Sequence, residues 1–326
     1  MSEAALRVEN LRTHFFTRRG VVKAVEDVSF SVAPGKILGL VGESGSGKSV
    51  MGFSIMGLVD PPGRVVGGRI LLGGRDLLRL APEEMRQVRG NRIAMIFQDP
   101  MMTLNPVLRI DTQMTEAVRA HADVGRRAAL ERARDALARV GIASPDERLS
   151  AYPHQFSGGM RQRVAIAIAL LNQPDLIIAD EPTTALDVTV QGQILYEMQK
   201  IARESGTALI WISHDLSVIA GLADEICVMY AGRVVEHGSV DQVLDEPLHP
   251  YTGGLIASVP SRNRRGEALR QIPGMTPSLL ELAPGCAFRE RCSRADGACA
   301  QDPALSSPAA DRQVRCFHPL TQGATA

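Results

Sequence analysis

The sequence predicts an α/β protein with a mainly parallel sheet, an antiparallel β layer, a helical insert and a small loop-rich C-terminal module. Three observations predict this class. A glycine-rich run at 42–49 lies between an apolar run and a helical segment, strands alternate with helices over 176–230, and the stretch 99–153 has helical spacing. The expected domains are residues 1–246, with the helical insert at about 99–173, and residues 247–326.

Residues 6–34 are expected to form antiparallel strands. Val28, Phe30 and Val32 alternate with serines, a spacing typical of a half-buried strand, and Arg18-Arg19-Gly20 predicts a hairpin turn. Phe15 and Phe16 are adjacent, and neighbouring strand residues point to opposite faces. At most one of these two rings is therefore expected in the core.

The run Gly42-Glu43-Ser44-Gly45-Ser46-Gly47-Lys48-Ser49 fits G-x-x-x-x-G-K-[ST], the phosphate-binding loop, and follows the apolar strand 37–41. Its glycines let backbone N–H groups surround a polyphosphate beside a helix N-terminus. Lys48 is expected to reach the β- and γ-phosphates, and Ser49 to ligate Mg²⁺. The sequence therefore predicts binding of a nucleoside triphosphate. The predicted contacts are Gly42, Glu43, Ser44, Gly45, Ser46, Gly47, Lys48, Ser49 and Val50.

After the loop, apolar runs and helical spacing alternate along the chain. The predicted strands are 67–74, 92–97, 176–181, 207–212 and a final hairpin of 224–230 with 233–236. The predicted helices are 49–56, several within 99–153 including one closed by Gly141, 157–171 and 188–205. This order favours a parallel sheet, because parallel strands need crossover connections.

Asp180 and Glu181 close the buried strand 176–181 with two carboxylates. Asp180 is expected to hold Mg²⁺ through water, since this ion gives up its hydration shell reluctantly. Glu181 is expected to polarise the water that attacks the γ-phosphate.

Charge and hydropathy exclude other classes. Acidic and basic residues balance at 36 each, so no net field favours nucleic acid or anionic lipid. No apolar run approaches the ~18–20 residues that span a bilayer. The first residues lack the pattern of a secretory signal. The chain is expected in the cytosol, with any membrane contact made through a partner.

Taken together these motifs resemble the nucleotide-binding subunit of ABC transporters over about residues 6–245. Besides the loop and Asp180-Glu181, the resemblance rests on Gln98, Ser157-Gly158-Gly159-Met160, Ala185-Leu186-Asp187 and His214, in that family's order. Met160 departs from the family's usual glutamine and cannot donate the same hydrogen bond.

The resemblance implies two subunits paired head-to-tail, each ATP lying between one phosphate loop and the partner's Ser157, Gly158 and Gly159. It implies that Gln98 reaches the metal and the attacking water, that His214 contacts the γ-phosphate, and that Asp187 contacts nucleotide. Phe15 matches the aromatic residue that stacks on adenine, with Phe16 as the alternative. Lys48, Gln98, Glu181 and His214 are the implied catalytic residues; Ser49, Gln98 and Asp180 are the implied Mg²⁺ ligands.

Three stretches look like the dipeptide/oligopeptide importer branch, which also includes nickel importers: residues 41–49, residues 97–106 and His249-Pro250-Tyr251-Thr252. This implies an ATP-hydrolysing subunit at the cytoplasmic face of the cell membrane. The implied partners are two membrane-spanning permease subunits, a second related ATPase subunit in a heterodimer and an extracytoplasmic solute-binding protein, with no nucleic acid.

The cargo stays open among dipeptides, longer peptides, nickel and other small solutes. An ABC-type ATPase acting on DNA is disfavoured, because the insert lacks sustained heptads and no basic stripe exists. A metal-sensing regulator built around the C-terminal cysteines leaves the ATPase motifs unexplained.

Five cysteines remain. Cys227 lies in a predicted strand and is expected as a small apolar core residue. The loop-rich tail contains the other four, Cys286, Cys292, Cys299 and Cys316. Disulfides are improbable in a reducing cytosol, and the tail is too poor in apolar residues to build its own core. A bound metal that holds the tail folded is therefore expected. Gaps of five, six and sixteen residues between these cysteines lack the tight pair of most zinc sites. Four cysteines suit a [4Fe–4S] cluster, which the resemblance also implies; Zn²⁺ is the alternative, and free structural thiols are the third.

Overall fold

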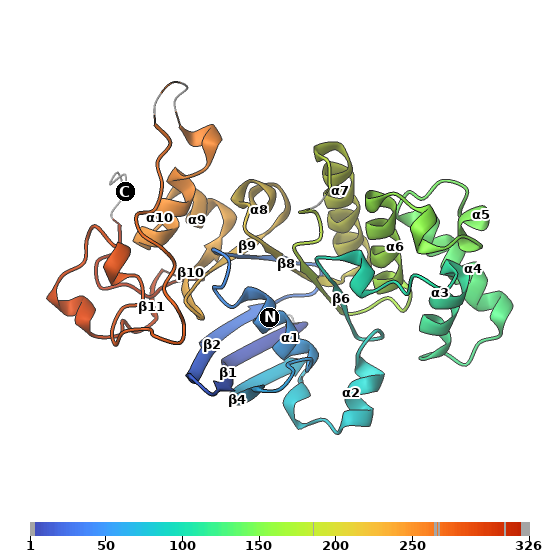
Figure 1. The fold of residues 1–326 in the computed structure, drawn as a ribbon, viewed down its shortest axis with the longest axis horizontal. Coiled ribbons are helices and arrows are strands. Elements are labelled where there is room, and N and C mark those ends of the chain that lie inside the picture. The colour runs from blue at the N-terminus through green and yellow to red at the C-terminus, as the bar shows by residue number, and fades with distance from the viewer. Residues whose placement is uncertain (1–3, 185, 264–265, 267, 310, 321–326) are drawn as a thin grey trace. The chain divides into compact units, whose positions relative to one another are not determined.

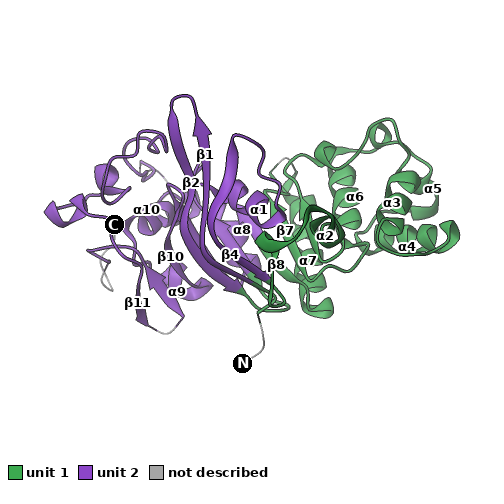
Figure 2. Ribbon diagram, turned by 90° about the horizontal axis from the view of Figure 1, so that it is seen from below, with its two compact units in different colours: residues 1–6, 32–37, 72–210 green, residues 7–31, 38–71, 211–326 purple. Residues whose placement is uncertain are grey.

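The computed structural model describes residues 4–184, 186–263, 266, 268–309 and 311–320. Contacts divide the chain into two compact units (Figure 2). Unit 1 holds residues 1–6, 32–37 and 72–210, and unit 2 holds residues 7–31, 38–71 and 211–326. The division falls within strand β8 (Ala208–Ser213). No helix among these described residues is long and apolar enough to cross a membrane.

Unit 1 is built on two parallel strands, β6 (Ile93–Ile96) and β7 (Leu176–Asp180), which pair from Ile93–Leu176 to Ile96–Ala179. Every residue of both strands is buried, as expected of parallel strands covered on both faces. Because the strands are parallel, the residues that follow them emerge at the same edge, and Gln98 and Glu181 both do so.

Helices make up most of the rest of unit 1. The predicted helical stretch 99–153 is confirmed, but it forms separate pieces, of which α4 (Arg126–Arg139) is the longest. Within α4, Ala129, Ala133, Ala136 and Leu137 are buried, giving one apolar face at helical spacing. Figure 1 shows α3 (Ile110–Arg119), α4 and α5 (Pro145–Leu149) grouped beside α6 (Gly158–Leu170), and α4 contacts the other three helices. The helices are α2 (Pro82–Val88), α3 (Ile110–Arg119), α4 (Arg126–Arg139), α5 (Pro145–Leu149), α6 (Gly158–Leu170) and α7 (Val188–Ser205).

Unit 2 contains the predicted antiparallel layer, with strands in the order β2 (Gly20–Val32), β1 (Leu6–Thr17) and β4 (Gly63–Leu72). The predicted alternation is confirmed, since Val28, Phe30 and Val32 are buried and the serines between them are not. The hairpin between β1 and β2 also lies where it was expected.

A second group of strands in unit 2 begins with β3 (Ile37–Val41), which is parallel to β9 (Glu225–Tyr230). The predicted hairpin of β9 with β10 (Arg233–Ser239) is confirmed, but it is not the final one. The C-terminal region adds β12 (Arg312–Val314) to β10, and β11 (Ser306–Ala309) pairs with β12. Helices α1 (Lys48–Met56), α8 (Leu216–Leu222), α9 (Val240–Asp245) and α10 (Pro250–Ala257) complete the unit.

The C-terminal region shares a core with the β9–β10 hairpin. The ring of Tyr230 lies 4.6 Å from that of Tyr251 and 5.2 Å from that of Phe288, centroid to centroid. A buried ion pair joins Arg312 to Glu236 at 2.9 Å. Residues after 246 therefore pack in the same compact unit as the phosphate loop; the predicted domain boundary at 246/247 stays a prediction.

Candidate active site

The phosphate-loop segment connects β3 to α1 within unit 2. Gly42 has φ 156° and Gly47 has φ 102°. A Cβ added at Gly42 would lie 2.2 Å from the Met229 carbonyl oxygen, and one added at Gly47 would lie 2.2 Å from that of Ala24. The loop therefore winds so close to neighbouring backbone that only glycine fits at both ends.

Lys48 begins α1 and is buried, with 5% of its surface exposed. Its Nζ donates to the carbonyl oxygen of Gly42 at 2.7 Å and to that of Glu43 at 3.0 Å. Ser49 follows in the first turn of the helix. A loop of backbone N–H groups, a helix N-terminus and an ammonium group form a site for a polyphosphate.

In unit 1, Asp180 is buried at the end of β7 and Glu181 follows it. Glu181 has φ 46°, a left-handed conformation that is strained for a residue with a side chain. Its Oε2 accepts from Gln98 Nε2 at 3.4 Å and from Thr184 Oγ1 at 3.2 Å. The structure thus brings together the predicted base and the predicted glutamine.

The predicted segment Ser157-Gly158-Gly159-Met160 of unit 1 opens α6. Ser157 is the N-cap residue, and its Oγ accepts from the backbone N–H of Met160 at 3.3 Å. A Cβ added at Gly158 would meet nothing within 4 Å, whereas one at Gly159 would lie 3.1 Å from Val190. The first N–H groups of a 13-residue helix thus lie beside a residue without a side chain.

Asp187 caps α7 by accepting from the Val190 N–H at 3.0 Å. Ala185 of the same motif lies outside the described residues. The observed role of both Ser157 and Asp187 is helix capping, and their contact with nucleotide stays a prediction.

Three further predicted residues, two of them alternatives for one role, lie in unit 2. Phe15 is half-buried against Gly63, where an added Cβ would lie 2.5 Å from its ring. Phe16 is 40% exposed, with the Arg64 guanidinium carbon 4.3 Å from its ring centroid. The choice between these rings for adenine stays a prediction. His214 is exposed and directly follows β8, the strand end predicted for it.

One feature of the loop was missed by sequence reasoning. The Glu43 carboxylate accepts two hydrogen bonds from Arg291, and the Glu43 backbone N–H donates to Tyr251 Oη at 2.8 Å. These hydrogen bonds from Arg291 lower the pKa of Glu43 below its usual value. Arg291 is 248 residues away along the chain, so no local pattern could have paired them.

Cys227 is fully buried in β9, which confirms it as a core residue. Of the four tail cysteines, Cys299 is buried and the others are half-buried. Burial raises the pKa of Cys286 and Cys292, and raises that of Cys316 to about 11, which favours neutral thiols.

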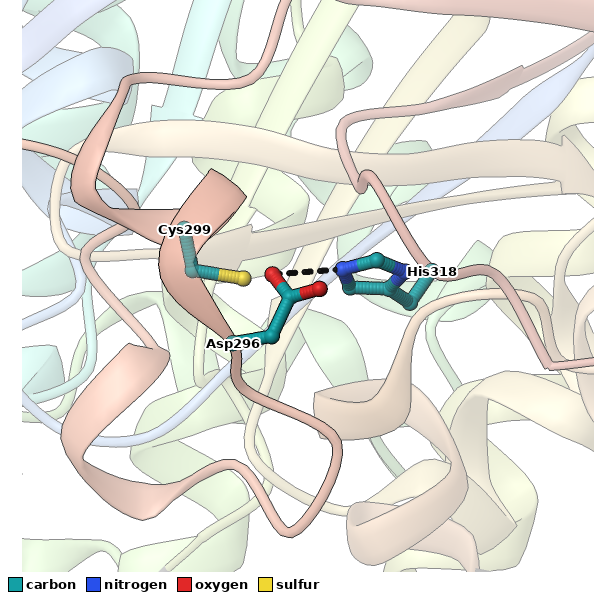
Figure 3. A group of neighbouring side chains, drawn as sticks. All are labelled: Asp296, Cys299 and His318. Carbon is teal, nitrogen blue, oxygen red and sulfur yellow. Dashed lines mark ion pairs between the residues drawn. The ribbon is translucent and has the colours of Figure 1, made fainter.

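Figure 3 shows the side chains of Asp296, Cys299 and His318 gathered in the tail. In each of these three residues one atom could bind a metal, and these atoms lie within 4.8 Å of one another. Asp296 Oδ1 lies 2.9 Å from His318 Nε2, a contact that is an ion pair when the imidazole is protonated. This group contains one of the four predicted cysteines.

Two family models match the chain. The model described as "ABC transporter" matches residues 25–184, and "Oligopeptide/dipeptide transporter, C-terminal region" matches residues 235–299. The oligopeptide transport ATP-binding protein OppD of Escherichia coli (strain K12) is 46% identical over 321 residues, covering 98% of this chain and 95% of that protein. The dipeptide transport ATP-binding protein DppD of Bacillus subtilis (strain 168) is 50% identical over 291 residues, covering 89% and 87%.

Solved structures agree in fold. The dimeric structure of MJ0796, a bacterial ABC transporter cassette, is 26% identical with a TM-score of 0.65, covering 72% of this chain and 98% of that one. A post-hydrolysis state of the same cassette, bound to ADP and Pi, has a TM-score of 0.66 at 25% identity, covering the same shares. The ABC ATPase fold and ATP hydrolysis predicted from the sequence are confirmed.

The prediction of a [4Fe–4S] cluster is wrong. The matched relatives are described as ATP-binding proteins of peptide transport, and nothing in those descriptions indicates an iron–sulfur cluster. The prediction relied on the number and compartment of the cysteines and on the family resemblance. A half-buried thiol is also stable as an ordinary packing residue.

Proposed function

This chain belongs to the ATP-binding proteins of the ABC transporter family, in its oligopeptide/dipeptide branch, and we propose that it hydrolyses ATP to energise uptake of dipeptides or oligopeptides. The observation that carries this proposal is the joint occurrence, in one chain, of the ABC region at 25–184 and the peptide-transporter region at 235–299. The nickel and DNA alternatives have no comparable support, because the named relatives are peptide transport proteins.

The phosphate loop binds the triphosphate in this proposal. The backbone N–H groups of 42–47 surround the phosphates, and Lys48 turns from the loop carbonyls towards the β- and γ-oxygens. Ser49, Gln98 and Asp180 supply a hydroxyl, an amide and a carboxylate, oxygen ligands that suit Mg²⁺. Held by these residues, the ion would supply positive charge beside the phosphates.

Glu181 acts as the base that polarises the attacking water. Its carboxylate is oriented by Gln98 and Thr184, and its left-handed backbone fixes the direction in which it leaves β7. His214 contacts the γ-phosphate. Phe15, or Phe16 in its place, stacks on adenine.

The cassette acts as part of an assembly. Ser157, Gly158 and Gly159 of one subunit face the nucleotide held by the other, so the helix N-terminus of α6 contacts the γ-phosphate only while ATP is intact. The dimeric form described for MJ0796 supports this pairing. The partners are membrane permeases and a substrate-binding protein. In finer detail, we propose two permease subunits and a related second ATPase subunit. We also propose that the chain lies at the cytoplasmic face of the membrane.

Reconstitution tests this function. The chain is co-expressed and co-purified with two candidate permeases and a candidate second ATPase, and placed in proteoliposomes with a candidate binding protein and a labelled peptide. ATP-dependent uptake is expected, and the Lys48→Ala complex serves as the inactive control. The chain alone is expected to be mainly monomeric and a weak ATPase. Uptake of nickel in place of peptide, or full solute-coupled activity from the isolated chain, would refute the proposal.

A further inference from the structure

The phosphate loop is tied to the C-terminal region through Glu43. Arg291 donates to this carboxylate from both terminal nitrogens of its guanidinium group, Nη1 to Oε2 at 2.6 Å and Nη2 to Oε1 at 2.9 Å. Thr276 Oγ1 donates to Oε2 at 2.9 Å. Together with the Glu43 N–H bond to Tyr251, both the main chain and the side chain of this loop residue are held by residues after 250.

Arg291 is itself fixed in place. Its side chain is 6% exposed, and its Nε donates to the Pro273 carbonyl oxygen at 2.8 Å. Its guanidinium carbon lies 5.8 Å from the ring centroid of Tyr230 and 6.0 Å from that of Phe288. A planar guanidinium group held this way imposes one orientation on the carboxylate that it pairs with.

The loop is also held at Ser46, which is buried and whose carbonyl oxygen accepts from the Gly232 N–H at 2.9 Å, but its other side is open. A Cβ added at Gly45 would meet nothing within 4 Å among the described residues, so this side of the loop is not packed. Glu43 is also the residue whose carbonyl oxygen accepts from Lys48. Movement of Glu43 would therefore shift both the N–H groups of the loop and the lysine.

We propose that Arg291 is a positioning residue for ATP binding, which acts through its bidentate pair with Glu43. The C-terminal region thereby sets the geometry of the phosphate loop. This inference rests on the proposed role of the loop in binding ATP. In this proposal Arg291 acts on ATP binding through Glu43, with which it makes two hydrogen bonds.

A double-mutant cycle on the full chain tests the proposal. Arg291→Lys keeps the charge but removes the bidentate geometry, and Glu43→Gln keeps the shape but removes the charge. Each is expected to raise the Kd for MgATP about tenfold, and the double variant to raise it no more than about twofold beyond either one, because both changes break the same link. In the assembled transporter the same variants raise the KM for ATP.

Arg312→Lys is the matched control. Arg312 is equally buried, with a 6% exposed side chain, and its ion-pair partner Glu236 lies outside the phosphate loop. This variant is expected to lower the Tm while changing the ATP Kd less than twofold. Unchanged ATP affinity in Arg291→Lys with a lowered Tm, as in the control, overturns the proposal, and so do additive effects in the double variant.

If Arg291→Lys does not fold, Glu43→Gln and Thr276→Val test the same link from the loop side. Unchanged ATP affinity in both overturns it. A wild-type chain that binds no ATP would instead refute the proposed function, and the inference with it.

Discussion

Replacing Gly47 with alanine tests whether close backbone contact is what shapes the phosphate loop. Gly47 is the N-cap residue of α1, with φ 102°, and an added Cβ would lie 2.2 Å from the backbone oxygen of Ala24. Real Cβ atoms do not approach closer than 3.0 Å, so the loop or the β2 backbone must retreat. Gly45→Ala is the matched control, because Gly45 also has a positive φ, 79°, but its Cβ would meet nothing within 4 Å.

Comparing the two variants separates the free-energy cost of a left-handed alanine from the cost of the steric clash with Ala24. A left-handed alanine costs roughly 1–2 kcal/mol, which both variants share. The collision adds about 1–3 kcal/mol of overpacking to Gly47→Ala alone. At roughly 2–4 °C per kcal/mol, the Tm of Gly47→Ala is expected to lie about 2–12 °C below that of Gly45→Ala.

Thermal unfolding without nucleotide measures this difference, and the increase in Tm on adding MgATP then reports binding. Gly47→Ala is expected to lose most of that increase, because a displaced loop no longer aims its N–H groups at the phosphates. Equal Tm values for the two variants would show that contact with Ala24 does not shape the loop.

Glu181→Gln is expected to keep ATP binding and to slow phosphate release by the assembled transporter by about two to four orders of magnitude. Lys48→Ala, in contrast, should weaken ATP binding itself. Near-normal turnover in Glu181→Gln would show that Glu181 is not the base. A pH dependence is expected from His249, whose pKa burial lowers to about 3, and whose neutral Nδ1 accepts from the Tyr251 N–H. Between pH 6.5 and 3 the unfolded chain binds up to one more proton than the folded chain. The free energy of unfolding therefore decreases as the pH is lowered, by up to about 1.4 kcal/mol per pH unit. His249→Asn, which can still cap α10, should show a shallower slope in urea unfolding over this range, and parallel slopes would contradict the assignment.

Local signals in the sequence were sufficient for most elements. The helix predicted at 188–205 has those bounds, and the strand–loop–helix around Lys48 is confirmed to within one residue. These elements carry their own information, because spacing of apolar residues and capping positions act over a few residues. Gln98 and Glu181 meet for a related reason: both follow buried parallel strands, so the predicted order of strands brings them to one edge.

Contacts between distant segments could not be predicted in this way. Nothing near Glu43 indicates Arg291, since the pairing depends on how the tail folds back over β9 and β10. The strands β11 and β12 were missed for a similar reason: Ser306–Ala309 is exposed throughout and has no alternation, and it becomes a strand by pairing with β12. In the cysteine-containing tail, the number of cysteines and the family resemblance together predicted a cluster that the comparisons contradict.

The pairing of β12 with β10 has a practical consequence for shortened forms of this protein. Glu236 and His237 lie opposite Val314 and Gln313, so the outer edge of β10 is covered by the last strands of the chain. A chain cut after residue 246 would present that edge, with unpaired N–H and C=O groups, to any neighbouring molecule. It would also leave Tyr230 without Tyr251 and Phe288. Such a truncated cassette is expected to aggregate on expression, whereas a cut near residue 320 leaves the edge covered.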